Sequence, residues 1–143
     1  MNQADGATAA RPHFTFSLLH TAQMVADRLE AALGNVGLSM AKQSALSRLA
    51  EAGEPMTLGD LAEQLSCVRS NITQLVDRLE ADDLVRRVND PSDRRSVRAE
   101  LTELGIEKQA AGAAELLLAQ EEMSARMSMS HLAALDSALL SLE

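Results

Sequence analysis

Apolar residues recur at helical spacing along most of the chain, and each run breaks off at turn-forming residues. The pattern predicts helices over residues 13–36, 40–52, 57–65, 69–82 and 103–127, and a last helix after Ser130. Ser39, Thr57 and Ser130 stand where helix N-caps are expected. Residues 1–12 are small and polar and are predicted to form a mobile tail.

Two short valine-containing segments interrupt this helical pattern. Residues 85–89 and 97–101 flank Asp90-Pro91-Ser92-Asp93, a turn by composition, and are predicted to pair as a β-hairpin. The order of elements indicates a mainly α fold with a small β-wing. We expect a winged helix-turn-helix domain over 38–102, and a helical dimerisation region over 13–37 and 103–143. The end helices cannot bury their apolar stripes on so small a middle, so a second copy of the chain is the expected partner.

The predicted helix over 69–82 is amphipathic. Its apolar face carries Ile72, Val76 and Leu79, while its polar face carries amide, hydroxyl and guanidinium groups. Such a face can contact base edges in a DNA major groove, where Gln74 could form two hydrogen bonds with an adenine. Arg78 could bind a phosphate of the DNA backbone. An ordinary solvated helix face has the same pattern, so this helix alone does not decide the function.

The predicted hairpin carries Arg94 and Arg95 beside its turn, with Asp93 directly before them. An arginine at a hairpin tip can enter a DNA minor groove, whose narrow walls concentrate negative potential. We expect Asp93 to orient the guanidinium group through a charge-assisted hydrogen bond. A solvated loop is the alternative, but a helix-turn-helix directly followed by an arginine-tipped hairpin is the less common combination.

The net charge of −8 seems to argue against a nucleic-acid partner, but its distribution is uneven. Residues 67–100 hold seven of the 13 basic residues, all of them arginine, together with seven acidic residues. The rest of the chain is acidic. The same charges also fit a solvated surface, so charge alone leaves both interpretations open.

Five motifs in the middle of the chain belong together. They are Leu58-x-x-Leu61-Ala62-Glu63-x-Leu65, then Arg69-Ser70-x-Ile72-Thr73-x-Leu75-Val76-Asp77-Arg78-Leu79-Glu80, Leu84-Val85-Arg86-Arg87, Asp90-Pro91-x-Asp93-Arg94-Arg95-Ser96-Val97 and Leu101-Thr102-x-x-Gly105. This set resembles the MarR (multiple antibiotic resistance regulator) family of winged helix-turn-helix transcriptional regulators. The resemblance is close over residues 39–105 and extends to the terminal helices only by pattern.

The resemblance implies a homodimer that binds a pseudo-palindromic operator on double-stranded DNA, most often as a repressor released by a small organic acid or phenolic effector. It implies that Arg95 enters the minor groove, braced by Asp93. The residues expected at DNA are Arg69, Ser70, Asn71, Thr73, Gln74, Arg78, Asp93, Arg94 and Arg95. The residues expected near an effector are Phe14, Phe16, Met24 and Met40, although these four also suit a dimer core.

Three positions depart from the family pattern. Ser66 stands where glycine is frequent, Val68 stands where a capping residue is usual, and Gln74 stands where arginine is frequent. Val68 cannot cap a helix through its side chain, at a typical cost of about 1 kcal/mol. These departures bear on affinity and operator sequence rather than on the fold.

Other classes of function have little support in the sequence. The three histidines are scattered, no nucleophile or phosphate-loop motif is present, and we expect neither an enzyme nor a metal or other cofactor. No secretory or membrane-spanning segment is recognisable, so the expected compartment is the cytoplasm. The single cysteine, Cys67, leaves a redox-responsive regulator as one alternative, although a buried small side chain is the simpler interpretation. A winged-helix protein-interaction module and a ligand-free architectural regulator are the others.

Overall fold

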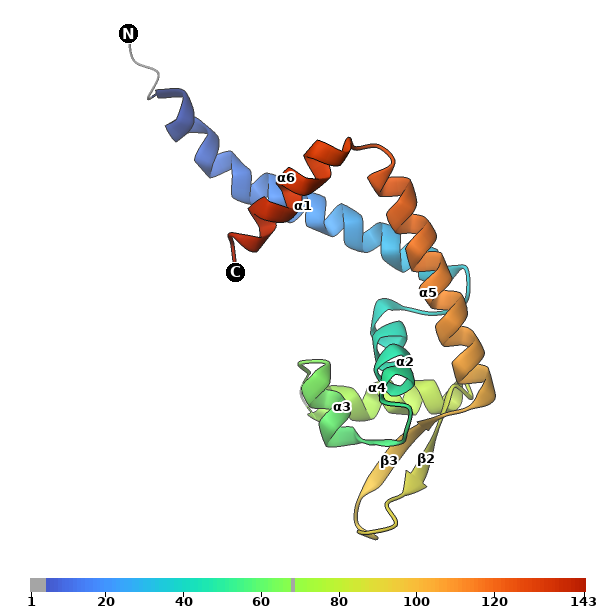
Figure 1. The fold of residues 1–143 in the computed structure, drawn as a ribbon. Helices are drawn as coiled ribbons and strands as arrows, with labels where there is room; N and C mark the ends of the chain where they lie inside the picture. Colours follow the sequence, from blue (N-terminus) through green and yellow to red (C-terminus); the bar gives the residue numbers. More distant parts are fainter. Residues whose placement is uncertain (1–4, 68) are drawn as a thin grey trace.

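The computed structural model describes residues 5–67 and 69–143 of the 143-residue chain, with the side chains of residues 13–67 and 70–143. The described residues form six helices and three strands (Figure 1). In chain order these are α1 (Asp5–Gly34), α2 (Met40–Ala52), β1 (Met56–Thr57), α3 (Leu58–Gln64), α4 (Arg69–Ala81), β2 (Val85–Asn89), β3 (Val97–Leu101), α5 (Glu103–Ser124) and α6 (Met129–Leu140). The predicted mainly α fold with a small β-wing is confirmed.

The molecule has two parts (Figure 1). The winged lobe comprises α2, α3, α4 and the sheet, and the arm comprises α1, α5 and α6. In Figure 1, α5 runs from the winged lobe to the far end of the arm, where the chain turns back into α6. Over the residues that the structure describes, no helix combines the length and apolar character needed to cross a lipid bilayer.

The helices of the winged lobe begin and end where capping chemistry requires. The Ser39 side chain accepts a hydrogen bond from the backbone N–H of Lys42 at 3.2 Å, and α2 ends at Gly53, which adopts a φ of 67°. The Thr57 side chain accepts the N–H of Asp60 at 3.1 Å and so opens α3. Both predicted N-caps are confirmed. The apolar faces of these helices meet in one core with Leu46, Leu61 and Leu79 among its fully buried members.

The sheet contains one strand that the sequence pattern did not predict. Its order is β1-β3-β2, with both pairs antiparallel. Strands β2 and β3 pair over the predicted residues, from Val85 opposite Leu101 to Asn89 opposite Val97. Strand β1 is too short to show an alternating pattern, and it pairs Met56 with Ala99 on the other edge of β3. This third strand ties the base of the wing to the start of α3.

The ends of three helices differ from their predicted positions. Helix α1 already begins at Asp5, so the backbone of residues 5–12 continues the helix predicted from His13 and does not form a tail, while residues 1–4 lie outside the described residues. Helix α5 ends at Ser124 rather than 127. Ser128, and not Ser130, caps α6, because its side chain accepts the N–H of His131 at 3.2 Å.

The Leu101-Thr102-x-x-Gly105 motif joins the wing to the arm. The Thr102 hydroxyl donates to the backbone oxygen of Asp83 at 2.6 Å and accepts the N–H of Gly105 at 2.9 Å. A Cβ on Gly105 would lie 1.9 Å from the backbone oxygen of Leu84, so only glycine lets α5 lie this close to the corner between α4 and β2. The motif therefore fixes where α5 leaves the winged lobe.

Candidate nucleic-acid interface

Helix α4 presents the two faces that its sequence predicts. Ile72, Val76 and Leu79 are buried in the core of the winged lobe. The residues on the opposite side are all exposed, and they are Ser70, Asn71, Thr73, Gln74, Asp77 and Arg78. The Arg69 side chain and residue 68 lie outside what the structure describes, so the predicted weak cap at Val68 stays a prediction. The exposed hydroxyl and amide groups form a polar reading surface on α4.

The turn before α4 holds an unusual backbone conformation. Ser66 has a φ of 51°, in the left-handed region that favours glycine. This explains in physical terms why glycine is frequent at this position in the resembling family. The next residue, Cys67, is partly buried and packs against the core, while its N–H donates to the backbone oxygen of Ala62 at 3.0 Å. The environment of Cys67 is that of a small packed side chain.

The wing tip is organised around Asp93, but not as predicted. The Asp93 carboxylate accepts the backbone N–H of Arg95 at 2.9 Å, and the Asp93 backbone oxygen accepts the N–H of Ser96 at 3.0 Å. Within the described residues, no ion pair joins Asp93 to the Arg95 guanidinium group. The expected brace therefore acts on the backbone, as an Asp side chain commonly does two residues before a turn amide.

The base of the wing is held by Asp90, whose side chain is only 8% exposed. One Asp90 oxygen accepts the N–H and the hydroxyl of Ser92, and the other accepts Arg98 Nε at 3.0 Å. Arg98 also donates to the backbone oxygen of Pro55 at 3.0 Å. The hydrogen bonds from Ser92, followed by the one from Arg98, lower the pKa of Asp90 below its usual value. This cluster connects the hairpin to the loop before β1.

The arginines of α4 and the hairpin whose side chains the structure describes separate into two groups. Arg86 pairs with Glu100 across the sheet at 2.6 Å, and Arg98 pairs with Asp90. Arg87 joins β2 to α4 through Asp77 and Glu80, and its hydrogen bond with Asp77 is the main cause of a raised Arg87 pKa. Three arginines are therefore neutralised by partners within the winged lobe.

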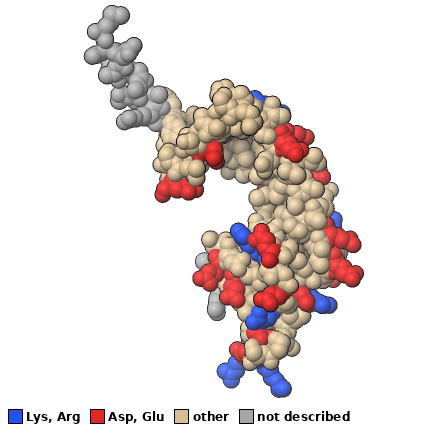
Figure 2. All heavy atoms as spheres, viewed as in Figure 1, with Lys and Arg blue, Asp and Glu red and all other residues tan. Residues whose placement is uncertain are grey.

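The second group is formed by Arg78, Arg94 and Arg95. Among the side chains that the structure describes, these three arginines of the winged lobe are exposed and have no carboxylate partner. Figure 2 shows positive side chains projecting from the wing tip, well separated from the acidic residues along the arm. The net charge of the 67–100 segment hides this separation, because its internal ion pairs lie at the base of the wing and its unpaired cations lie at the tip and on α4.

A groove of about 460 Å³ connects the wing to the helix-turn-helix. It is lined by the start of α3, by Ile72 and Thr73 of α4, and by Asp93, Arg95 and Val97 of the wing. The groove places Arg95 on the same side of the winged lobe as the polar face of α4. Of the predicted DNA-contacting residues with described side chains, Thr73, Asp93 and Arg95 line this groove together.

The predicted effector residues lie on two helices and differ in exposure. Phe14, Phe16 and Met24 are exposed on α1, with Phe16 74% exposed, whereas Met40 is half-buried at the edge of the core. None of the four lines a groove between α1 and α5 that has a volume of about 440 Å³.

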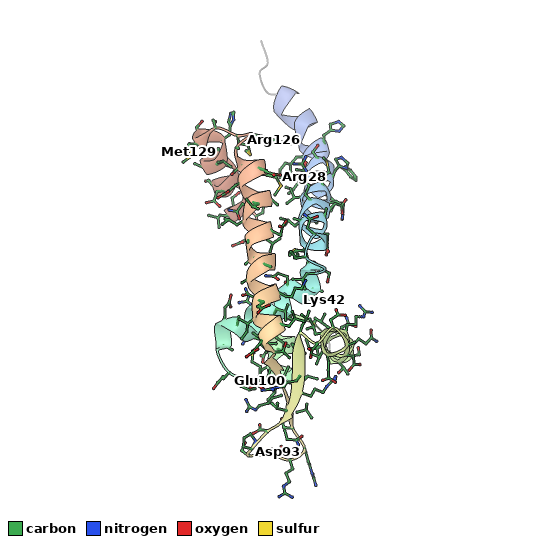
Figure 3. All side chains as sticks on the ribbon, turned by 90° about the vertical axis from the view of Figure 1, so that its right-hand side faces the viewer. Arg28, Lys42, Asp93, Glu100, Arg126 and Met129 are labelled. Carbon is green, nitrogen blue, oxygen red and sulfur yellow. The ribbon has the colours of Figure 1, made fainter. Side chains whose placement is uncertain are left out.

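Two residues that the sequence pattern did not single out, Arg28 and Arg126, lie in this groove between α1 and α5. Arg28 comes from α1 and Arg126 from the turn that follows α5, at the end of the molecule opposite to Asp93 (Figure 3). The groove also contains Glu115 and Glu122 and an apolar floor that includes Leu118 and Met123. Two arginines 98 positions apart in sequence give no local signal, and only the packing of the helices brings them together.

Comparison with known proteins agrees with this geometry. The sequence model of the MarR family matches residues 38–97, which comprise the winged lobe up to the start of β3. The winged lobe is that of the MarR family. Its sequence is 35% identical over 85 residues to YsmB of Bacillus subtilis, which is described as an HTH-type transcriptional regulator; the match covers 59% of this chain and 58% of YsmB. The chain spans about half the length of the curated relatives it matches.

Solved MarR-family structures extend the likeness to the arm. AbsC, a MarR-family transcriptional regulator from Streptomyces coelicolor, is 29% identical with a TM-score of 0.75, over 99% of this chain and 94% of AbsC. CouR from Rhodococcus jostii RHA1, solved with bound p-coumaroyl-CoA, is 28% identical with a TM-score of 0.72, over 90% of each chain. The MarR family consists of DNA-binding regulators and not of enzymes, as the sequence motifs led us to expect.

Proposed function

We propose that this MarR-family protein binds double-stranded DNA as a homodimer and regulates transcription, most simply as a repressor. In this proposal α4 lies in the major groove, with Ser70, Asn71, Thr73 and Gln74 at base edges and with Arg69 and Arg78 at phosphates. The wing lies along the neighbouring minor groove, where Arg95 enters and Arg94 contacts the backbone. A two-fold symmetric dimer would recognise a pseudo-palindromic operator.

The observation that carries this proposal is the distribution of unpaired arginines. Arg78, Arg94 and Arg95 have no carboxylate partner among the described side chains, although the protein as a whole is strongly acidic. A purely structural role would pair these cations as Arg86, Arg87 and Arg98 are paired. Unpaired arginines beside a polar helix face suit a ligand that supplies the negative charge, as DNA does.

The arm supports the homodimer part of the proposal. Helix α6 has no buried residue, and its apolar side chains, such as Met129 at 83% exposure, face solvent in the single chain. Exposed apolar residues also follow α1, including Phe14, Phe16 and Leu19. Apolar surface of this extent is typical of an interface between subunits. The arm helices of a second copy are the partner that we propose.

We further propose that a small organic acid modulates DNA binding. CouR, which has the same fold, was solved with p-coumaroyl-CoA. In this chain the groove between α1 and α5 is lined by Arg28 and Arg126, by the apolar Leu118 and Met123, and by Glu115 and Glu122. The two guanidinium groups are the proposed partners of a carboxylate on an apolar body, with the two glutamates restricting where that carboxylate can lie. Titration calorimetry with a panel of aromatic and aliphatic acids tests this step, with Arg28→Ala as the variant expected to lose binding. If every acid leaves operator affinity unchanged, a ligand-free architectural regulator is the better description.

The central experiment measures operator binding by fluorescence anisotropy, after the operator has been found by sequencing genomic fragments that the protein selects. We expect Arg95→Ala to weaken binding by about 1–3 kcal/mol. Arg86→Ala is the matched control, because it removes an arginine of the same hairpin that is already paired with Glu100. Affinity should also fall steeply with salt as counterions are released.

A winged-helix protein-interaction module is the outcome that would replace this proposal. It predicts no preference for any selected sequence over random DNA at low salt, and no difference between Arg95→Ala and Arg86→Ala. Either result in a correctly folded dimer would overturn the proposed DNA-binding role.

A further inference from the structure

Among the contacts between α5 and its neighbours, two are made at buried glycines. Gly105 and Gly112 are its only buried residues among those that the structure describes. The contact at Gly105 belongs to the Leu-Thr-x-x-Gly motif described above. The contact at Gly112 belongs to no motif, and it lies on α2 rather than at the corner between α4 and β2.

At the second contact, the Gln43 side chain of α2 fills the space in front of Gly112. A Cβ on residue 112 would lie 2.2 Å from Gln43 Oε1, 2.7 Å from Gln43 Cδ and 2.9 Å from Leu38 Cδ1. Since a Cβ replaces one Cα hydrogen of glycine, that hydrogen points at the amide oxygen. Gln43 is only 3% exposed, and its Oε1 has no hydrogen-bond donor in the structure. A weak Cα–H···O contact with Gly112 is what remains for this oxygen.

The other end of the Gln43 amide fixes its orientation. Gln43 Nε2 donates to the backbone oxygen of Gln109 at 3.0 Å, one turn before Gly112 on the same helix. Rotating the amide would place its oxygen against that carbonyl oxygen. The amide therefore cannot turn away from Gly112 without losing its one short hydrogen bond.

Further polar contacts follow the same face of α5. Lys108 Nζ donates to the backbone oxygen of Val36 at 2.9 Å, and Asn35 Nδ2 donates to Glu115 at 3.1 Å. Residues 108, 112 and 115 are spaced so that they share one face of the helix. Over these two turns, α5 contacts the segment between α1 and α2 through Lys108 and Glu115. It contacts α2, the first helix of the winged lobe, at Gly112.

Two separated contacts fix the direction of α5 relative to the winged lobe, whereas a single contact would let the helix rotate about that point. The glycines lie seven residues apart, so the two contacts are separated by about 10 Å along α5. We infer that the Gln43–Gly112 contact sets the angle between the winged lobe and the arm, and through it the separation of the two recognition helices in the dimer. Gln43 and Gly112 are thus positioning residues for DNA binding. This inference rests on the proposed homodimer and deepens it.

The substitution Gly112→Ala tests the inference directly. The new Cβ needs roughly 1 Å more room, and opening one contact by that amount over an arm of about 10 Å tilts the winged lobe by about 6°. Gly34→Ala is the matched control, since nothing lies within 4 Å of a Cβ at this other helical glycine. The double variant Gln43→Ala/Gly112→Ala removes the amide that the new Cβ meets, and it should restore the original angle.

The readout is the distance between the two α4 helices of the dimer. It is measured by pulsed dipolar spectroscopy on a spin label at Gln74→Cys in a Cys67→Ser background. We expect Gly112→Ala to shift this distance by about 2 Å or more, a size common for helix shifts at interfaces, and to change the preferred spacing of operator half-sites. Gly34→Ala should change neither quantity, and the double variant should return both toward wild type.

Other results would overturn the inference. If Gly112→Ala has the same interlabel distance and half-site spacing as Gly34→Ala, the contact does not set the angle. If the double variant is shifted as far as Gly112→Ala alone, the clash with Gln43 is not the cause.

Unfolding in urea separates this inference from the proposed function. Because Gln43 and Gly112 are in contact, their effects on the unfolding midpoint should not be additive within the single chain. Additive effects would overturn the contact itself. If instead the labelled Gln74→Cys/Cys67→Ser protein shows no dipolar coupling and the wild type shows no specific DNA binding, while the two substitutions still couple, the homodimer and regulator proposals fail and the contact stands.

Discussion

The Asp93 carboxylate holds the backbone N–H of Arg95 at 2.9 Å and leaves the Arg95 guanidinium group without a carboxylate partner among the described side chains. An acid at a DNA-facing tip would be unfavourable if it only added negative charge. Its hydrogen bond to the backbone instead fixes the direction in which residue 95 leaves the turn. The Arg95 side chain is thus left without a neutralising carboxylate, as its proposed role in a minor groove requires.

This arrangement predicts different effects for two substitutions of Asp93. Asp93→Asn keeps an oxygen that accepts the Arg95 N–H, and it removes one negative charge, so operator affinity should stay equal or rise. Asp93→Ala loses the acceptor, and affinity should fall by about 1 kcal/mol, the usual net value of one hydrogen bond. Fluorescence anisotropy on the selected operator distinguishes the two. A guanidinium brace would instead make Asp93→Asn as damaging as Asp93→Ala.

The base of the wing predicts an acid-sensitive contribution to stability. The hydrogen bonds from Ser92 and Arg98 lower the pKa of Asp90 in the folded protein below the usual 3.8. The ionised form is therefore favoured by folding, so its contribution is fully present above pH 3.8 and is lost as the pH falls through the lower folded pKa. Urea unfolding between about pH 5 and about pH 2 should show a smaller loss for Asp90→Asn than for wild type. Equal slopes for both proteins would contradict this assignment.

The turn of the helix-turn-helix predicts a stabilising substitution. Ser66 is exposed and has a φ of 51°, which costs a residue with a Cβ about 1–2 kcal/mol. Ser66→Gly relieves this cost but increases the freedom of the unfolded chain, so we expect a net gain of about 0.5–1 kcal/mol. Ser66→Ala is the control and should bring no gain, because alanine retains the Cβ. Chemical denaturation at neutral pH measures both.

The close packing at Gly105, where the chain leaves the wing, predicts that a substitution there strongly destabilises the protein. At Gly105 a Cβ would meet a backbone oxygen at 1.9 Å, and a backbone atom cannot rotate away as a side chain can. Gly105→Ala should therefore destabilise the protein by about 3 kcal/mol or more. Gly34→Ala, with open space around its Cβ, should be neutral or slightly stabilising. A thermal unfolding midpoint that is unchanged in Gly105→Ala would show that α5 is not held so closely.

Local chemistry made much of the fold predictable. Ser39 and Thr57 cap their helices as expected, and the strands on either side of the Asp90-Pro91 turn pair over the predicted residues. These features depend on neighbours within a few positions. The predicted cap of α6, Ser130, was wrong by two positions, because the His131 N–H donates to Ser128.

The features that were missed depend on distant partners. Gly112 meets Gln43 across 69 positions, and Arg98 reaches the backbone of Pro55 across 43. No periodic pattern in the sequence reports such contacts. At the wing tip the sequence indicated the correct acid, Asp93, but not which N–H it would accept, because the side chain and the backbone of Arg95 are both within its reach.

The separation of charge described above also gives the molecule an electric dipole. Positive side chains project from the wing tip, while much of the negative charge is spread along the arm and the sides of the winged lobe (Figure 2). In the field of a DNA duplex such a molecule is turned before it makes contact, with the wing leading and the arm held away. The acidic character of the chain then favours productive encounters, since wrongly oriented approaches are repelled.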